Sequence, residues 1–494
     1  MSQKDQIQSL NHSISILWSG PVTAEGVRWL QSIGVSRKLI TDVASRSRKR
    51  TPILVDGSVR PLPYWGEFFA ALFPTLTESS IKSYAYDARR FAAFLHNRNT
   101  DVVNATQADL VAYRMSRTDQ TTGQGVSHAT WSREKTLISM IYTFLVHRGF
   151  VKRKPWVQIG ARSPIDHPGL PGSPRIRFLS HDQWRTFQTV GLKGQLPNGE
   201  LDIRWRVPHP LRNSTGARLA LDTGMRLNEF SSVLDLEVPL TLNDSVTFDI
   251  EATAKFSKKR TIVVPPETLR AIDLYRRTER RNLVLSTMSA RMKQLKNLAI
   301  VTDLDFTHRK LTIQFHGDQA TLDIPKIPSS MRRVLVIETK DGYEPMSLFI
   351  GSNGLALQRR AWSSAFAAAS KRIHRFLDTP GMPRMPPRVT AHDLRHTFAI
   401  VVLRTMMLMA SSREAARRQG ELGHGSMSDH IVHNPVLAVQ RLLGHSSPLT
   451  TMTYLRYVED TEEVVRHALN SWEDTERNYL DYLGEIFSRR GDND

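Results

Sequence analysis

A stretch dense in helix-breaking residues divides this chain into two parts of different character. Between residues 163 and 178 the sequence contains Pro164, Pro168, Pro171, Gly172 and Pro174. Proline removes a backbone donor and fixes φ, and glycine adds flexibility, so a helix does not continue through such a stretch. The sequence therefore predicts a linker at 164–178 with a separate domain on each side.

Length and charge limit what these domains can do. A chain of 494 residues exceeds what one hydrophobic core usually supports, so two or three domains are expected. A formal net charge of +19 attracts polyanions, of which nucleic acid and acidic membrane are the main candidates. The absence of cysteine excludes disulfides, thiolate nucleophiles and zinc–thiolate sites. Any nucleophile must therefore be an oxygen or an amine.

The location of the protein is predicted from its apolar segments. The best candidate for a membrane span, residues 398–410, is too short and is interrupted by Arg404, so we predict a buried helix there and no membrane association. Residues 1–13 do not show the pattern of a secretory signal. We therefore expect a cytoplasmic protein.

Residues 1–62 form an N-terminal extension of mixed character that can contact DNA. It contains an apolar patch at Ile14, Leu17 and Trp18 and a basic cluster at residues 46–50. Such a cluster can lie along a phosphate backbone or form a solvated loop, and the sequence does not favour either.

Residues 63–163 have the apolar spacing of a helical domain. A possible N-cap at Thr77 precedes one apolar stripe, Asn104–Leu110 indicates a capped helix start, and residues 137–145 contain a second stripe. The polar faces of these helices are basic. A basic helical face can grip a duplex or simply be solvated. The DNA-binding candidates on these faces are Lys82, Arg89, Arg90 and Arg133.

The second domain begins at a predicted helix cap, Ser180. Further along, an apolar helix ends at Gly224, which Arg226 and Glu229 follow closely. A glycine there lets the next helix start sharply and directs Arg226 inward, with Glu229 one turn later. Taken alone, an Arg–Glu pair at this spacing is usually a surface pair.

Two regions of the second domain alternate apolar and polar residues as strands do. Residues 246–250 and 261–264 predict a hairpin with a cationic tip, and residues 298–325 predict another hairpin or a small sheet. A helix is expected at 362–376. The tip can enter a DNA groove or be an ordinary exposed turn; its candidate DNA-binding residues are Lys258, Lys259 and Arg260.

The stretch from Ala391 to Tyr457 combines residue types that suit phosphoryl transfer. His392, Arg395, His445 and Tyr454 lie within it. Breaking a phosphodiester requires fixed cations, an acid for the leaving alkoxide and a placed nucleophile. Arginine supplies two parallel hydrogen bonds to phosphate oxygens, histidine transfers protons, and tyrosine can form a covalent ester. This chemistry requires no metal and no cofactor.

Four short blocks of the sequence resemble the signature of the tyrosine recombinase (phage integrase) family. In chain order they are Thr-Gly-Met-Arg-Leu-Asn-Glu, which contains Arg226, then His392-Asp-Leu-Arg395, Leu-Gly-His445 and Tyr454. The resemblance implies that Arg226 and Arg395 clamp the scissile phosphate. It implies that His392 and His445 position the phosphate and assist proton transfer. Tyr454 would be the nucleophile.

The family's hairpin lysine, the general acid for the leaving 5′-hydroxyl, matches Lys255 best. Ala254 and Phe256 stand where the family usually has glycines beside this lysine. Lys258 or Lys259 therefore remains an alternative general acid.

The resemblance also implies a fold that is mainly α with a small β component. An all-helical, SAM-like core-binding domain at 63–163 would join a mixed α+β tyrosine-recombinase catalytic domain at 179–470, which has an insertion around 280–335. The two would form a C-shaped DNA clamp. The implied function is site-specific recombination or integration through a 3′-phosphotyrosine and a four-way junction for a mobile element, with the protein nucleoid-associated when bound to DNA.

The implied partners are double-stranded DNA, further copies of the chain in a tetrameric synaptic complex, and accessory DNA-bending proteins. Residues 471–494 are expected to form a C-terminal helix and tail that docks on a neighbouring protomer or packs on its own domain. The apolar stripe of this region is Trp472, Tyr479, Leu483 and Ile486.

Other functions and another nucleophile remain open at this point. A type IB topoisomerase or a hairpin-forming resolvase would use the same chemistry, and a DNA-binding protein without catalysis would keep only the binding surface. Tyr457 is the rival nucleophile, but the family's interval after His445 favours Tyr454.

Overall fold

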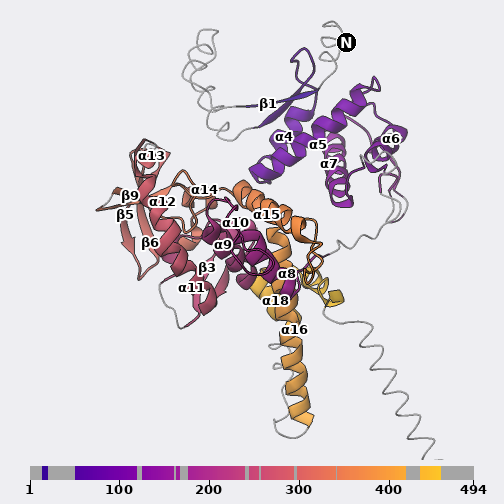
Figure 1. The fold of residues 1–494 in the computed structure, drawn as a ribbon. Coiled ribbons are helices and arrows are strands. Elements are labelled where there is room, and N and C mark those ends of the chain that lie inside the picture. The colour runs from indigo at the N-terminus through magenta and orange to yellow at the C-terminus, as the bar shows by residue number, and fades with distance from the viewer. Residues whose placement is uncertain are drawn as a thin grey trace, which may run out of the picture. The chain divides into compact units, whose positions relative to one another are not determined.

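The computed structural model describes residues 14–19, 51–119, 125–158, 160, 163–166, 176–239, 244–254, 258–293, 297–340, 342–418 and 434–457. The chain divides into two compact units, unit 1 at residues 1–173 and unit 2 at 174–494. This division lies inside the predicted linker. Helices predominate and the sheets are small, which confirms the mainly α fold class (Figure 1). The C-shaped clamp and the other domain boundaries stay predictions.

Unit 1 combines a helical module with a two-stranded sheet. Strand β1 pairs antiparallel with β2, with Ser15 opposite Val55, and Ile14 and Leu54 pack into the core that the helices share. Part of the N-terminal extension therefore belongs to this unit, and the expected all-helical module also carries a small sheet. The elements of unit 1 are β1 (Ser15–Trp18), β2 (Pro52–Val55), α4 (Trp65–Leu72), α5 (Glu78–His96), α6 (Gln107–Thr118) and α7 (His128–His147).

Side-chain caps explain where two of these helices begin. The Thr77 hydroxyl accepts the N–H of Ser80 at the start of α5. Thr106 and Asp109 form a reciprocal capping box at the start of α6. Such caps satisfy backbone N–H groups that the first helical turn leaves without a partner. The predicted helix starts are confirmed at both positions.

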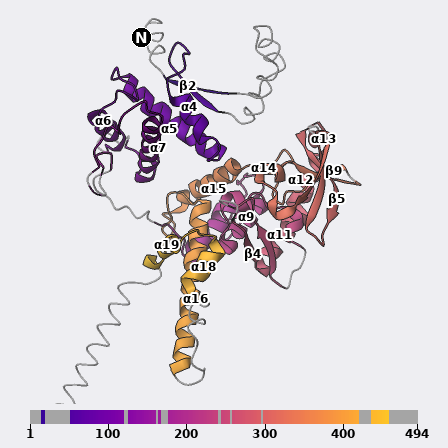
Figure 2. The same cartoon turned by 180° about the vertical axis from the view of Figure 1, so that it is seen from behind.

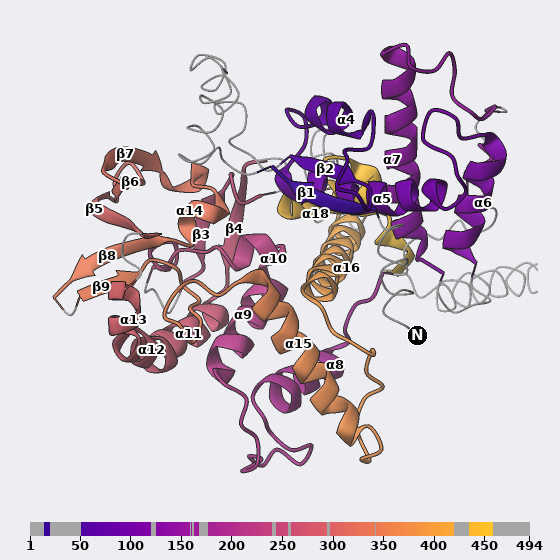
Figure 3. The same ribbon diagram turned by 90° about the horizontal axis from the view of Figure 1, so that it is seen from above.

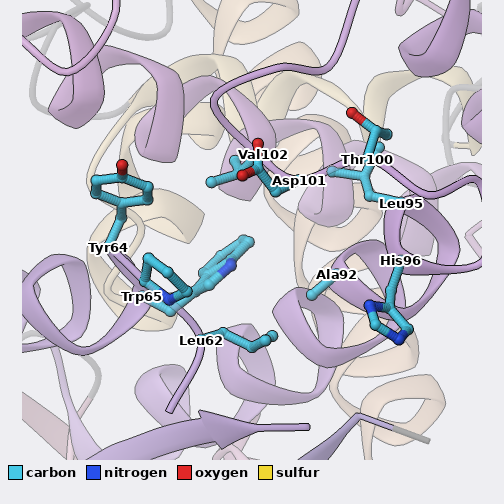
Figure 4. A pocket seen from close by; sticks show the side chains of 10 residues that line it. Leu62, Tyr64, Trp65, Ala92, Leu95, His96, Thr100, Asp101 and Val102 are labelled. Carbon is cyan, nitrogen blue, oxygen red and sulfur yellow. The ribbon is translucent and has the colours of Figure 1, made fainter. Parts of the chain in front are cut away.

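A small pocket lies in unit 1 between the start of α4 and the end of α5 (Figure 4). Trp65 and Leu95, both members of the core, line it together with Tyr64 and Asp101. The Asp101 carboxylate already accepts the N–H groups of Val103 and Asn104 at 3.0 and 2.9 Å. The pocket is therefore walled mainly by core side chains, with its acidic group engaged in a turn.

Helix α9 is central to the core of unit 2. Ala217, Leu219 and Ala220 on this helix are fully buried, and α9 packs against α11 and α16. The helical elements of unit 2 are α8 (His181–Thr186), η1 (Phe187–Leu192), α9 (Pro210–Thr223), α10 (Leu227–Phe230), η2 (Asp235–Glu237), α11 (Pro266–Tyr275), η4 (Arg276–Arg280), α12 (Arg281–Ser286), α13 (Met288–Lys293), η6 (Ile324–Lys326), α14 (Ser329–Arg332), α15 (Arg359–Ile373), η7 (His374–Phe376), α16 (Ala391–Arg418), α18 (Pro435–Leu443), α19 (Pro448–Met452) and η8 (Leu455–Tyr457).

Two sheets belong to unit 2. The predicted hairpin is present, with Val246 opposite Val264 and Ile250 opposite Arg260. The alternating region after it forms a larger, five-stranded sheet in the order β7-β6-β5-β8-β9 (Figure 3). The strands of unit 2 are β3 (Val246–Ile250), β4 (Arg260–Val264), β5 (Ala299–Asp305), β6 (Lys310–Phe315), β7 (Asp318–Asp323), β8 (Leu335–Thr339) and β9 (Gly342–Pro345).

A buried ion pair attaches the five-stranded sheet to the rest of unit 2. Arg332, from α14 beside this sheet, donates to both carboxylate oxygens of Glu237 at 2.6 and 3.0 Å. Both side chains are 1% exposed. A bidentate pair with fixed geometry restricts rotation as well as separation. The five-stranded sheet is therefore held firmly to η2.

Helix α16 extends beyond the packed body of unit 2 (Figures 1 and 2). Its first turns are buried, but Val401, Leu408 and Met409 are 54%, 70% and 58% exposed. The prediction of a buried helix at 398–410 is therefore wrong for its second half, because the helix outruns the core that covers Ala399, Ile400 and Leu403. Among the described residues, no helix is both long and apolar enough to cross a membrane.

Candidate active site

A tight turn after α9 places Arg226. Gly224 ends the helix in the left-handed region, at φ 61°, and a Cβ there would lie 2.4 Å from the ring of Phe398. Only glycine fits both demands. Arg226 follows as the N-cap of α10, and its Nη1 donates to Glu229 Oε1 at 3.0 Å. The Arg226 side chain is 25% exposed, so it remains open to a ligand.

Glu229 joins two arginines and is itself fully buried. Besides Arg226, it forms an ion pair with Arg260 at the start of β4, and Arg260 also donates to the carbonyl of Leu442. Arg260 is 7% exposed, so the predicted DNA contact for Arg260 is corrected. The cause is the pleat of β4, which alternates buried and exposed residues and turns this side chain inward.

Arg395 is the most deeply buried of the predicted catalytic residues that the structure describes. Its Nη1 and Nη2 donate to the carbonyls of Gly224 and Leu443, each at 2.6 Å, and the side chain is 1% exposed. These bonds connect the turn after α9 to the end of α18. Burial, followed by the charges of Arg226 and Arg260, lowers the pKa of Arg395 to about 9. Arg395 therefore still carries its positive charge at neutral pH.

His445 is positioned by the end of α18. Gly444 closes that helix in the left-handed region, at φ 64°, and its Cα lies so close to Arg260 that a Cβ would meet Cδ at 3.0 Å. His445 Nδ1 is 2.9 Å from Thr451 Oγ1. Burial, followed by the charge of Arg395, lowers the pKa of His445 to about 3. At neutral pH the ring is therefore uncharged.

Tyr454 lies against two histidines. Its hydroxyl is 2.8 Å from His396 Nδ1, and its ring stacks on His445 with 6.2 Å between centroids and an interplanar angle of 13°. The residue is 2% exposed. Burial raises the pKa of Tyr454, whereas the charges of Arg395 and Arg226 oppose that rise. The tyrosine is therefore protonated at rest.

His392 lies one helical turn before His396 on α16, with the ring centroids 4.2 Å apart. His392 keeps an exposed surface, and its partial desolvation, followed by the charge of Arg395, lowers its pKa. The structure therefore brings Arg226, His392, Arg395, His445 and Tyr454 into one site. In the part of the chain that the structure describes, no group of three or more His, Asp or Glu residues is placed to hold a metal ion.

The predicted general acid, Lys255, lies outside the described residues. The nearby alternatives Lys258 and Lys259 are exposed and line a cavity together with Arg441 and His445. Lys259 is 3.3 Å from Asp249 across the hairpin. Both lysines therefore lie on the same cavity as a predicted active-site residue.

The rival nucleophile Tyr457 has a structural role. Its hydroxyl accepts the backbone N–H of Ile176 at 3.0 Å, and its ring meets Phe178 edge to face at 5.9 Å. No hydrogen bond joins it to the described histidines of the site. This arrangement favours Tyr454 over Tyr457.

The DNA-binding candidates of unit 1 differ in their surroundings. Lys82 and Arg89 are exposed, but Arg133 donates to the buried Asp87 at 2.7 and 2.9 Å and Arg90 pairs with the same carboxylate. Two charges shared with one buried acid hold α5 and α7 together. Both arginines are therefore held by Asp87, but their side chains stay 35% and 41% exposed, so the DNA contact of Arg90 and Arg133 stays a prediction.

One site residue was missed by the sequence analysis. His396 directly follows Arg395 and lies four residues after His392, a spacing that places the two histidines on the same helix face. That spacing is the signal that could have identified it. Its contact with Tyr454, 58 positions away in the chain, appears only in the folded structure.

No protein-family model matches the chain, and no curated protein sequence matches it. Among solved structures it is similar to the XerH site-specific recombinase bound to palindromic difH substrate in a post-cleavage complex, at 14% identity over 90% of this chain and 94% of that chain, with a TM-score of 0.47. It is also similar to the Tn1549 transposon integrase in complex with transposon right end DNA, at 13% identity over 82% and 97%, with a TM-score of 0.43.

A third similar structure is the XerA recombinase, at 15% identity over 83% of this chain and 97% of that chain, with a TM-score of 0.29. All these structures are recombinases or integrases. Because identity and TM-scores are low, the functional conclusion rests on the geometry of the site.

The contrast between Lys258 and Arg260 gives a first testable prediction. Lys258→Gln removes an exposed charge, so the affinity for a duplex of random sequence should fall. The negative slope of log affinity against log salt concentration should become shallower by about one. Arg260→Gln removes a buried charge and should leave that slope unchanged. Fluorescence anisotropy titrations at several salt concentrations measure both; equal slopes for the two variants would contradict the assignment.

Proposed function

We propose that the protein breaks and rejoins DNA as a site-specific recombinase or integrase of the tyrosine type, acting for a mobile element. Tyr454 attacks the scissile phosphate to give a 3′-phosphotyrosine, and the freed 5′-hydroxyl attacks the partner strand. Paired cycles form and resolve a four-way junction within a tetramer assembled on double-stranded DNA.

The observation that carries this proposal is the convergence of Tyr454 with Arg226 and Arg395. These residues come from distant parts of the sequence, yet Arg395 donates to the carbonyls of Gly224 and Leu443. Arg226 follows Gly224 by two positions, and His445 follows Leu443 by two positions, with its ring parallel to that of Tyr454. A pentacoordinate phosphorane requires cations fixed around the phosphate and a nucleophile directed at it. The site supplies both.

The hydrogen-bonding capacity of Arg395 supports the role of phosphate clamp. A guanidinium has five N–H donors, and the two bonds to Gly224 and Leu443 fix its plane. The remaining donors are then held in one orientation, which suits a tetrahedral or pentacoordinate oxygen array. Arg226 is held in place by its bond to Glu229.

Histidines kept neutral at rest also fit the proposal. His445 and His392 both have lowered pKa values beside Arg395, so both rings can accept hydrogen bonds or protons. Binding of an anionic phosphate offsets the arginine charges and raises the pKa of each ring. Proton transfer then becomes available when substrate is present.

The proposal is tested without knowing the target sequence. A pool of duplexes with random central sequence, each carrying one nick, is incubated with the protein. Cleavage near the nick releases a short strand, so religation is prevented and the covalent complex accumulates. We expect DNA that stays attached to protein after denaturation with detergent and disappears after protease treatment.

Sequencing the retained DNA should give one enriched site. Binding to the pool without any denaturant-resistant complex would instead indicate a DNA-binding protein without catalysis and would overturn the proposal. Mass spectrometry of the adduct identifies the modified tyrosine.

A further inference from the structure

The hydroxyl of Tyr454 has one close nitrogen neighbour among the described side chains, Nδ1 of His396 at 2.8 Å. The ring of His445 lies parallel to the tyrosine ring, with the centroids 6.2 Å apart, and its Nδ1 is directed to Thr451. His392 packs against His396 rather than against the tyrosine. His396 is therefore the described group best placed to receive the hydroxyl proton.

We infer that His396 is the general base that takes the proton of Tyr454 during strand cleavage. This inference rests on the proposed function and deepens it. As Tyr454 Oη forms its bond to phosphorus, the Oη–H proton passes to Nδ1 of His396, and the bond from phosphorus to the 5′-oxygen breaks with its electron pair leaving on that oxygen. The general acid protonates this oxygen. In religation the imidazolium of His396 returns the proton to Tyr454.

The charges around His396 make this transfer dependent on substrate. The groups that face the ring are His392 and Arg395 on its own helix, His445 after α18 and Arg177 before α8, together with Tyr454. Burial, followed by electrostatic repulsion from His392, Arg395, His445 and Arg177, lowers the pKa of His396 to about 3. The ring is therefore neutral at rest, while the tyrosine, with its raised pKa, keeps its proton.

A bound phosphodiester changes this balance. Its negative charge, held between the arginines, offsets the charge that acts on His396 and raises the pKa of the ring. Formation of the ester at the same time removes the proton from the tyrosine. The base is thus weak in the free protein and becomes effective when the scissile phosphate is in place.

The test compares His396→Asn and His396→Ala on a nicked duplex that the unaltered protein cleaves. Asparagine keeps a hydrogen-bonding group near the position of Nδ1 but cannot accept a proton at neutral pH. We expect single-turnover adduct formation to fall about 100-fold or more in both variants. His374→Asn, at an exposed histidine bonded to the Pro386 carbonyl, serves as the control and should react normally.

Two further measurements separate the base from other roles. The first uses a substrate in which sulfur replaces the bridging 5′-oxygen. Because the sulfur leaves without being protonated, this substrate rescues a variant that lacks the general acid. It should not rescue the His396 variants, which lack the base. The rate of the unaltered protein should fall as pH is lowered through the pKa of His396 in the complex, and this dependence should weaken in His396→Asn.

The possible outcomes are distinguishable. A rate for His396→Asn within about threefold of the unaltered protein would show that the bond only positions the tyrosine and would overturn the inference, as would rescue by sulfur. Absence of any adduct with the unaltered protein would instead remove the proposed function. Thermal unfolding of both His396 variants and of Tyr454→Phe, which breaks the same hydrogen bond, separates loss of chemistry from loss of fold.

Discussion

Replacing Tyr454 by phenylalanine should abolish the covalent protein–DNA complex while leaving DNA binding intact. Phenylalanine keeps the ring that stacks on His445 and removes only the hydroxyl, which is the atom that forms the ester. The hydroxyl is buried, and its hydrogen-bond partner among the described residues is His396. The loss should therefore be complete on the scale of a gel assay for denaturant-resistant adducts, with unchanged affinity in gel shifts.

Tyr457→Phe is the matched control for this experiment. It keeps the ring contact with Phe178 and loses one hydrogen bond to the N–H of Ile176, which contributes about 1 kcal/mol to stability. The adduct should form. If Tyr454→Phe kept the adduct and Tyr457→Phe lost it, the nucleophile would be Tyr457 and the assignment would be wrong.

Glu229→Gln should lower both stability and activity strongly. Glu229 is 1% exposed and pairs with the buried Arg260 and the half-buried Arg226. Removing one member of a buried ion pair leaves an uncompensated charge and costs about 3–5 kcal/mol. The midpoint of thermal unfolding should fall by about 10 °C, and adduct formation should slow because Arg226 loses its support.

A surface pair at the same spacing provides the control. Glu267 and Arg270 are also three residues apart, but their side chains are 58% and 55% exposed. Such pairs contribute about 0–1 kcal/mol, so Glu267→Gln should change neither stability nor adduct formation measurably. Equal small effects of the two substitutions would show that burial of Glu229 contributes little. The double variant Glu229→Gln/Arg260→Gln should recover part of the lost stability, since it removes the unpaired charge.

Local features of the fold could be predicted because their causes lie within a few residues. The Thr77 and Ser180 hydroxyls accept backbone N–H groups three positions later. Gly224 adopts its left-handed backbone conformation because it has no Cβ, which requires no distant partner. The β3–β4 hairpin follows from alternation on both sides of a short connection. Such elements depend on sequence-local chemistry and not on the rest of the fold.

Other features depend on partners that are distant in the sequence. The pairing of β1 with β2 joins strands on either side of a long intervening segment, and neither strand specifies the other. Arg260 looked like one more cation on a basic hairpin, and only Glu229 and the Leu442 carbonyl, far away in the sequence, turn it into a core residue.

The candidate site shows the same limit. Five of its described members could be named from short motifs in order, but no motif shows which side chains form hydrogen bonds with one another. The bond between His396 and Tyr454 depends on how α16 faces the chain after α19. Predicting it requires the packing of both elements.

The hydrogen bond between Ile176 and Tyr457 links two places that the sequence keeps far apart. Arg404 strengthens this link, because it donates to the Tyr457 carbonyl at 2.7 Å and lies over the Phe178 ring at 5.7 Å. Tyr457 stands three positions after Tyr454. The start of the described chain of unit 2 is therefore fastened to the turn that carries the proposed nucleophile, so a change in either segment is felt by the other.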